Sequence, residues 1–93
     1  MKLLVLLDNV TSDGDGQVVN PQTSGMNEFG IVQVSITGGT GTVKIQGRLS
    51  INMPWIDLIT FTADDSARIA LMPHMKANVS GISGATIRAE LGA

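Results

Sequence analysis

Cysteine and tyrosine are absent from the sequence, and histidine occurs once. Without cysteine the chain has no disulfide, no zinc–thiolate site and no thiol nucleophile. A single histidine and no tyrosine leave little for general acid–base chemistry. Six basic against eight acidic residues give a net charge of −2, and no basic block is present to hold a phosphate backbone. The composition therefore argues against an enzyme and against a nucleic-acid-binding protein.

Long apolar runs are also missing. The longest covers residues 3–7, between Lys2 and Asp8. A membrane span needs about 20 apolar residues and a secretory signal at least about seven, so we expect no membrane association, no signal peptide and synthesis in a cytoplasm. The run forms either the first strand of a sheet or a stripe that docks on a partner. The second interpretation makes four side chains candidate contacts: Leu3, Leu4, Val5 and Leu6.

What the sequence has in abundance is β-branched residues and glycine. Val, Ile and Thr together make up 25 of the 93 residues, and there are 11 glycines. A chain of this length folds as one domain, and folding can bury about 64% of its surface. β-branched residues favour strands, and Gly and Pro turns recur about every ten to twelve residues. We therefore predict an all-β fold, a single small β-sandwich of about seven or eight antiparallel strands.

Period-two alternation is clearest in residues 29–36 and 42–48, which flank a Gly-rich segment over 37–41. Strands that alternate in this way bury one face, and glycines supply the positive φ angles of a tight loop. We predict that these two strands form a hairpin. Further strands are predicted over 67–71, 75–80 and 85–91.

Residues 55–61 are apolar on both sides of a predicted strand. Such a strand is buried on both faces or has one face against a partner. We therefore expect a homo-oligomer, with Trp55, Leu58 and Ile59 as candidate contacts. Trp55 has two interpretations, a core residue or a platform on which a sugar ring stacks.

Residues 8–28 are rich in Asp, Asn, Ser, Gly and Pro, unlike the rest of the chain. A polar stretch of this length is either a functional loop or an extended arm. We therefore divide the chain into an N-terminal strand with an extended polar arm or loop, residues 1–28, and a sandwich body, residues 29–93. The less polar positions of the arm are candidate partner contacts: Val18, Val19, Pro21 and Met26.

The sequence matches known metal-binding and catalytic motifs only weakly. Asp13 and Asp15 fit the third and fifth positions of a calcium loop, but its last position is Gln22 instead of a bidentate carboxylate, and Asp-Gly turns explain both. His74 has no serine or acidic residue within four positions, so no catalytic triad is indicated. We expect no metal, no cofactor and no catalytic residue.

Seven short segments between residues 31 and 91 carry a recurring string of strand and turn residues. They are Ile31–Ile36, Gly38–Gly41, Thr42–Gly47, Trp55–Leu58, Phe61–Ala63, Pro73–Gly81 and Gly84–Ala89. The segments include the Gly-Thr turn at Gly38–Gly41 and, in the last pair of strands, the Val-Ser-Gly sequence at Val79–Gly81. In this order of strand and turn residues the chain resembles small structural proteins of tailed-bacteriophage virions.

The resemblance implies a non-enzymatic virion protein, made in the host cytoplasm, that acts as a dimer or trimer. The leading expectation is a capsid decoration (cement) protein that binds the major capsid protein, or another virion protein, across capsomers on the outer head surface. One alternative is a head-fibre or tail-tip component that adheres to host-surface glycans. Another is a free-standing carbohydrate-binding or adaptor domain. The family supplies no catalytic residues, and residues 8–28 lie outside the matching region.

Overall fold

The computed structural model describes residues 1–26 and 28–93, and its regular structure is all β. The eight strands are β1 (Leu3–Val10), β2 (Gly14–Asp15), β3 (Phe29–Thr37), β4 (Thr40–Arg48), β5 (Ile56–Phe61), β6 (Asp65–Ala70), β7 (His74–Ser83) and β8 (Thr86–Gly92). The prediction of an all-β sandwich with seven or eight antiparallel strands is confirmed.

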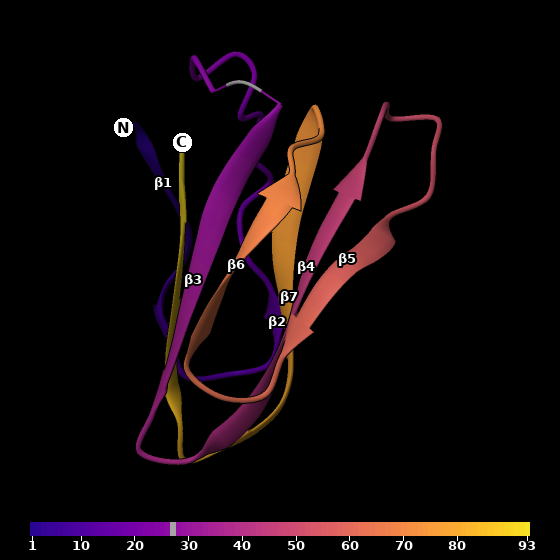
Figure 1. The fold of residues 1–93 in the computed structure, drawn as a ribbon. Coiled ribbons are helices and arrows are strands. Elements are labelled where there is room, and N and C mark those ends of the chain that lie inside the picture. The colour runs from indigo at the N-terminus through magenta and orange to yellow at the C-terminus, as the bar shows by residue number, and fades with distance from the viewer. Residues whose placement is uncertain (27) are drawn as a thin grey trace.

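The strands form two antiparallel sheets that pack face to face (Figure 1). Sheet A has the strand order β1-β8-β3-β6, and sheet B has the order β2-β7-β4-β5. Eight strands interleaved between two sheets in this order make a jelly roll. This topology lies beyond the sequence-based prediction, because local patterns of apolar residues do not specify which strands become neighbours.

The turn after β3 corrects the predicted hairpin. Both predicted strands exist, but β3 belongs to sheet A and β4 to sheet B, so the Gly38–Gly39 turn crosses the sandwich. The crossing from β7 to β8 lies against it. A Cβ atom on Gly39 would clash with the carbonyl oxygen of Ser83 and lie 2.7 Å from the carbonyl carbon of Gly84. Glycine is required at position 39 because two backbones approach closely there.

Alternate residues of the central strands fill the space between the sheets. In β3, Val32 and Val34 are buried while Gln33 between them is exposed. The buried apolar side chains are Leu6, Leu7, Met26, Val32, Val34, Val43, Ile45, Phe61, Ile69, Leu71, Met75, Ala77, Val79, Ala85, Ile87, Ala89 and Leu91. Within the described residues no polar or charged side chain is buried with them.

Two edge strands carry β-bulges that turn consecutive apolar residues toward the core. In β1 the register with β8 shifts around Leu6, and Leu6 and Leu7 are both buried. In β5 the register with β4 also shifts, and Leu58 and Ile59 both pack against the core. A bulge changes the alternation of side chains by one residue. The bulge in β5 therefore accounts, within a single chain, for the two consecutive apolar residues Leu58 and Ile59, whereas Ile56 stays half exposed.

Within the segment 8–28, predicted as an extended arm or loop, residues 8–26 follow the edge of the sandwich. Gly14–Asp15 pair with β7 as the short strand β2, at a place where we predicted a turn. Further along, Val19 forms one isolated bridge with Met75. Pro21 and Met26 are buried. The segment is thus packed on the body at several points along its length.

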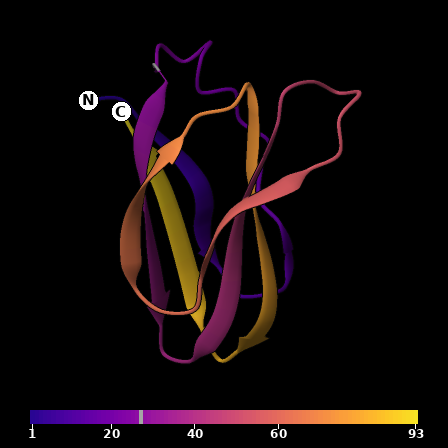
Figure 2. The ribbon, with the colours of Figure 1, turned by 45° about the vertical axis from the view of Figure 1, so that its right-hand side comes forward.

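The strand directions give the sandwich two distinct ends (Figures 1 and 2). Both chain termini lie at one of them, where the backbones of Lys2 and Ala93 exchange hydrogen bonds of 2.6 and 3.0 Å. We call this the terminal end; it also holds the connection leading into β3, the β4–β5 loop 49–55 and residues 71–73. The opposite end, which we call the turn end, holds the connections 11–13, 38–39, 62–64 and 84–85.

Candidate functional site

Exposed apolar side chains gather at the terminal end. Among the described residues the large exposed hydrophobics are Met1, Leu3, Val18, Phe29, Ile31, Leu49, Ile51, Met53 and Ile56. Strand register places Leu3 and Ile31 opposite Gly92 near the C-terminus, and Phe29 opens β3. Leu49, Ile51 and Met53 lie in the β4–β5 loop at the same end, and Val18 precedes the residue that bridges to Met75 near the start of β7. We call this set the apolar surface. Apolar side chains gathered on one part of a small protein mark a candidate contact site.

One part of the apolar surface lies on the outer face of sheet A. Leu3, Gly92 and Ile31 form one cross-strand row. Gly92 has no side chain, and a Cβ there would lie 3.0 Å from the sulfur of Met1 and 3.1 Å from a methyl group of Leu3. The two side chains therefore lean over the glycine. Beside them is a shallow hollow of about 280 Å³, also lined by Phe29 and Ile31.

A second part of the apolar surface is the β4–β5 loop, which projects from the sandwich in Figure 2. Leu49, Ile51 and Met53 alternate with polar residues there, and Ile51 is 75% exposed. A backbone hydrogen bond of 3.1 Å from Met53 N to the Ser50 carbonyl closes the turn. The loop thus presents three apolar side chains to solvent from a hydrogen-bonded turn.

Trp55 follows this loop and lies half-buried on the outer face of sheet B. The guanidinium carbon of Arg48 is 4.4 Å from the centroid of its ring, and Lys76 Nζ is 4.6 Å away. Both cationic side chains alternate with buried residues of β4 and β7, which is why they point outward. Trp55 is therefore neither a core residue nor a bare platform for a sugar ring.

Hydrogen bonds extend from these two cations. Arg48 Nε donates to His74 Nδ1 at 3.2 Å. Lys76 Nζ pairs with Asp15 at 2.8 Å, and Asn78 donates to the other oxygen of the same carboxylate at 2.9 Å. These bonds, with that from Lys76 the strongest, lower the pKa of Asp15 below its ordinary value. The outer face of sheet B therefore carries an ordered polar network around the tryptophan.

The two aspartates considered for a calcium loop are engaged by protein groups. Asp13 accepts hydrogen bonds from the backbone N–H groups of Gly81 and Ile82, at 3.1 and 2.9 Å. Asp15 belongs to the network just described. Across residues 1–26 and 28–93, no group of three or more acidic, His or Cys side chains is placed to hold a metal ion. The two carboxylates hold segments together that are more than 60 residues apart in sequence.

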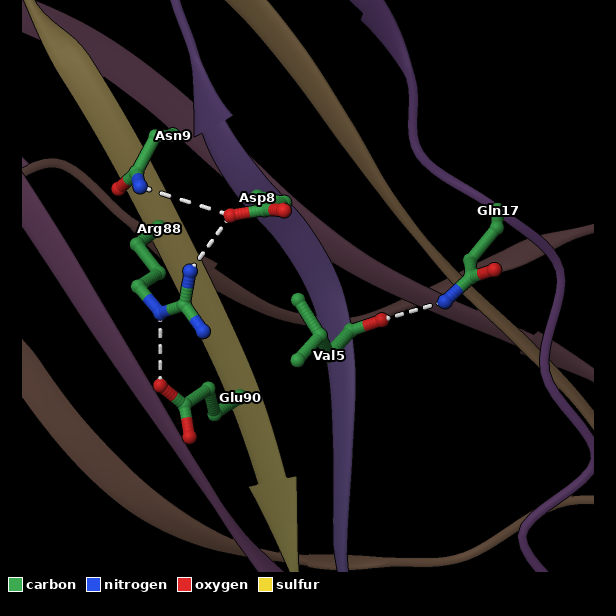
Figure 3. Close-up of polar contacts among 6 residues, drawn as sticks. All are labelled: Val5, Asp8, Asn9, Gln17, Arg88 and Glu90. Carbon is green, nitrogen blue, oxygen red and sulfur yellow. Dashed lines mark hydrogen bonds and ion pairs between the residues drawn. The ribbon is translucent and has the colours of Figure 1, made fainter.

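Figure 3 shows the polar contacts at the β1 edge of sheet A. Arg88 pairs with Asp8 at 2.6 Å and with Glu90 at 2.8 Å, and the bond to Glu90 is the main reason that the pKa of Arg88 is raised. Gln17 Nε2 donates to the Val5 carbonyl at 2.8 Å. It spans a groove of about 370 Å³ between β1 and the segment that follows β2. The Gln17 hydrogen bond therefore ties the segment after β2 to β1.

The structure divides the predicted contact residues into three groups. Leu3 and Val18 are exposed at the terminal end. The partly buried ones are Leu4, Val5, Val19, Trp55, Leu58 and Ile59. Leu6, Pro21 and Met26 are buried within the chain, and they offer no surface to a partner.

Several residues of the apolar surface lie outside the predicted set: Met1, Phe29, Ile31, Leu49, Ile51, Met53 and Ile56. The sequence does hold a signal for some of them. Phe29 and Ile31 occupy the outward positions of a strand whose inward positions are also apolar. Residues 49–53 alternate next to Pro54, which excludes a central strand. Apolar residues at positions that should face water are the signal for such a surface.

The arrangement suits binding to another macromolecule, because its parts are exposed apolar side chains, a tryptophan and arginines.

Among the residues that the structure describes, no helix is long and apolar enough to cross a membrane. No protein-family model matches the chain, and neither a curated protein nor a solved structure does.

Proposed function

We propose that this protein is a non-enzymatic virion structural protein of a tailed bacteriophage, a capsid decoration protein that binds the outer head surface across capsomers and stabilises it. The observation that carries the proposal is the gathering of exposed apolar side chains at the terminal end. A protein that stands on a larger assembly needs one end that makes contact and another that stays in water. The terminal end and the turn end have these two characters.

The apolar surface and the adjacent Trp55 together extend over both sides of the sandwich, which favours a partner made of two subunits. Leu3, Phe29 and Ile31 lie on the outer face of sheet A, whereas Trp55 lies on the outer face of sheet B. The β4–β5 loop projects at the same end. A flat partner would contact one of these parts, but a crevice between neighbouring capsid subunits would contact all of them.

Two general considerations support the proposal. Jelly rolls occur in viral capsid and lectin domains, although such a likeness of fold is an analogy and not a functional argument. Stabilisation of a shell also needs little from each copy, because many identical copies act together and each contributes a modest interface.

Cosedimentation with heads that lack the protein tests the proposal. The probe is the DNA-free head of the phage that encodes this chain, assembled without it. We expect saturable binding at a fixed number of copies per head, and heads that resist heating better once saturated. Lack of binding over the range of about 1 nM to 10 μM would contradict the proposal. Light scattering of the free protein tests the expected dimer or trimer. The support for that expectation is the resemblance and the exposed Ile56, because Leu58 and Ile59 pack against the chain's own core.

A head-fibre or tail-tip component that binds host glycans is the second candidate, favoured by the position of Trp55 on an outer face. Two cations over the ring weigh against it, since a sugar would have to displace one of them. Titration with host cell-wall polysaccharide, followed by tryptophan fluorescence, separates the candidates. A saturable change that the Trp55→Phe variant lacks, without binding to heads, would favour the fibre.

A further inference from the structure

The basic residues are not paired equally at the two ends of the sandwich. Three of the six have a carboxylate partner: Lys44 with Asp57 at 3.7 Å, Lys76 with Asp15 and Arg88 with Asp8 and Glu90. In the described part of the chain, Lys2, Arg48 and Arg68 make no ion pair. All three lie toward the terminal end: Lys2 beside the C-terminus, Arg48 opposite His74 and Arg68 opposite Ile31.

Two of these three cations are held in place by aromatic rings. Arg48 lies over Trp55, and the guanidinium carbon of Arg68 is 4.3 Å from the ring centroid of Phe29. Stacking fixes a guanidinium without neutralising its charge. Arg48 donates its Nε–H to His74, so the N–H groups of its two terminal nitrogens are left to bind a partner. An arginine that is already ordered loses less entropy when it binds.

Acidic side chains without a cationic partner show the opposite distribution. Asp13, Asp64 and Asp65 lie at the turn end, where backbone N–H groups of Gly81, Ile82, Ile36 and Ser66 bind them. Glu28, just before β3, is the exception at the terminal end. Among the charged side chains without an ion pair in the described residues, those at the terminal end are therefore cationic apart from Glu28, and those at the turn end are acidic. Such a separation of charge orients a protein as it approaches an acidic surface.

We propose that the terminal end recognises an acidic protein surface, an apolar crevice rimmed by carboxylates, with Arg48 and Arg68 as the residues that contact those carboxylates from the two faces of the sandwich. The proposal rests on the proposed function, because it names the chemistry of the partner at the same site. Arginine beside tryptophan or phenylalanine is the composition of interface hot spots. Nucleic acid is disfavoured because three dispersed cations on a chain of net charge −2 make a weak phosphate site.

Binding to the heads described above, measured between about 50 and 500 mM NaCl, tests this inference. Arg48→Gln and Arg68→Gln should each weaken binding about tenfold at low salt and flatten its salt dependence, because each removes one charge contact. Lys44→Gln is the matched control, since Lys44 points outward from the same strand as Arg48 but already has a carboxylate partner. This variant should bind like the wild type. Thermal unfolding of every variant checks that the sandwich is intact.

The outcomes separate the two proposals. If the wild type binds heads but both arginine variants bind equally well and salt has no effect, the acidic-partner inference is wrong while the docking function stands. If the wild type does not bind heads at any salt concentration, the proposed function itself fails. Equal or tighter binding to phosphatidylglycerol vesicles or to duplex DNA, lost in the same two variants, would overturn the assignment to a protein surface.

Discussion

The tightest constraint at the residue scale lies at Gly39, where the two crossings between the sheets meet. The backbone from Ser83 to Ala85 occupies the space that a side chain at position 39 would need. Neighbouring backbone cannot rotate away as a flexible side chain can. The close contact between the two crossings therefore requires a residue without a Cβ atom at position 39.

We predict that Gly39→Ala destabilises the fold by about 1 to 3 kcal/mol, the usual cost of overpacking. Gly81→Asn is the control, because Gly81 has a φ of 64° with nothing near its Cβ position and asparagine tolerates that conformation. Urea unfolding measures both variants. Equal stability of Gly39→Ala and the wild type would show that the crossings are not in contact.

Asp15 gives the fold a dependence on acid. Its pKa is lowered by Lys76 and Asn78, so its carboxylate stabilises the folded state above the ordinary pKa of an aspartate, about 3.9, and this contribution disappears as the pH falls through the lower folded value. Asp15→Asn should therefore cost about 0.5 to 1 kcal/mol at pH 7, because solvent screens the half-exposed carboxylate of Asp15, and should cost less at about pH 2.

The measurement is urea unfolding of Asp15→Asn and the wild type at both pH values. Asp65→Asn is the control, since Asp65 has no cationic partner within the described residues and accepts its hydrogen bond from the adjacent Ser66 N–H. A cost of Asp15→Asn that is the same at both pH values would contradict the role assigned to the carboxylate.

At the scale of elements, β5 shows how a bulge changes the meaning of a sequence pattern. Consecutive apolar residues at 58 and 59 suggest a strand with two apolar faces. The register shift with β4 turns both side chains toward the core. A methyl group of Leu58 lies over Gly47, 3.1 Å from the position that a Cβ atom would take there. An edge strand with such a bulge buries two consecutive apolar residues within one chain.

Leu58→Lys should therefore destabilise the monomer by about 1 to 3 kcal/mol, because it places a charge against the core. Thr60→Lys, on the same strand but exposed, should leave stability within about 0.5 kcal/mol of the wild type. Urea unfolding combined with light scattering distinguishes the possibilities. A Leu58→Lys variant of full stability that loses an oligomer would identify this face as an interface instead.

Strand positions were predictable from sequence because the alternation of Val32, Gln33 and Val34, and similar patterns, reflects a local property of a half-buried strand. Strand neighbours were not predictable in this way. The Gly38–Gly39 turn has the composition of a hairpin loop, yet it crosses between sheets, since the choice depends on contacts with a segment more than 40 residues away. Trp55 has the neighbours of a core residue, but it lies on the surface over Arg48 for the same reason.

The candidate site was less predictable than the fold. Leu3 and Val18 belong to it, but Phe29, Ile31 and the loop from Leu49 to Met53 do not stand out until strand directions bring them to one end. A surface assembled from residues distant in sequence has no local signature. The buried positions of Leu6 and Met26 likewise follow from the bulge in β1 and from the path of the segment before β3.

At the scale of the whole molecule, the two ends differ in both polarity and charge. The terminal end holds the apolar surface, Glu28 and the cations that make no ion pair within residues 1–26 and 28–93, and the turn end holds Asp13, Asp64 and Asp65. The central claim is that the terminal end is the one that docks. It predicts that substitutions at the terminal end weaken binding to heads, whereas substitutions at the turn end that change the stability of the fold equally little leave binding intact.

The most direct test compares two double variants for their affinity toward heads that lack the protein. Ile51→Asn with Met53→Asn alters the exposed loop of the terminal end, and Thr62→Gln with Thr86→Gln alters the exposed surface of the turn end. The first should lose about 100-fold in affinity, if each side chain contributes about 1.4 kcal/mol, with an unchanged unfolding midpoint. The second should bind like the wild type. Loss of binding in the turn-end variant, with full affinity in the loop variant, would contradict the account.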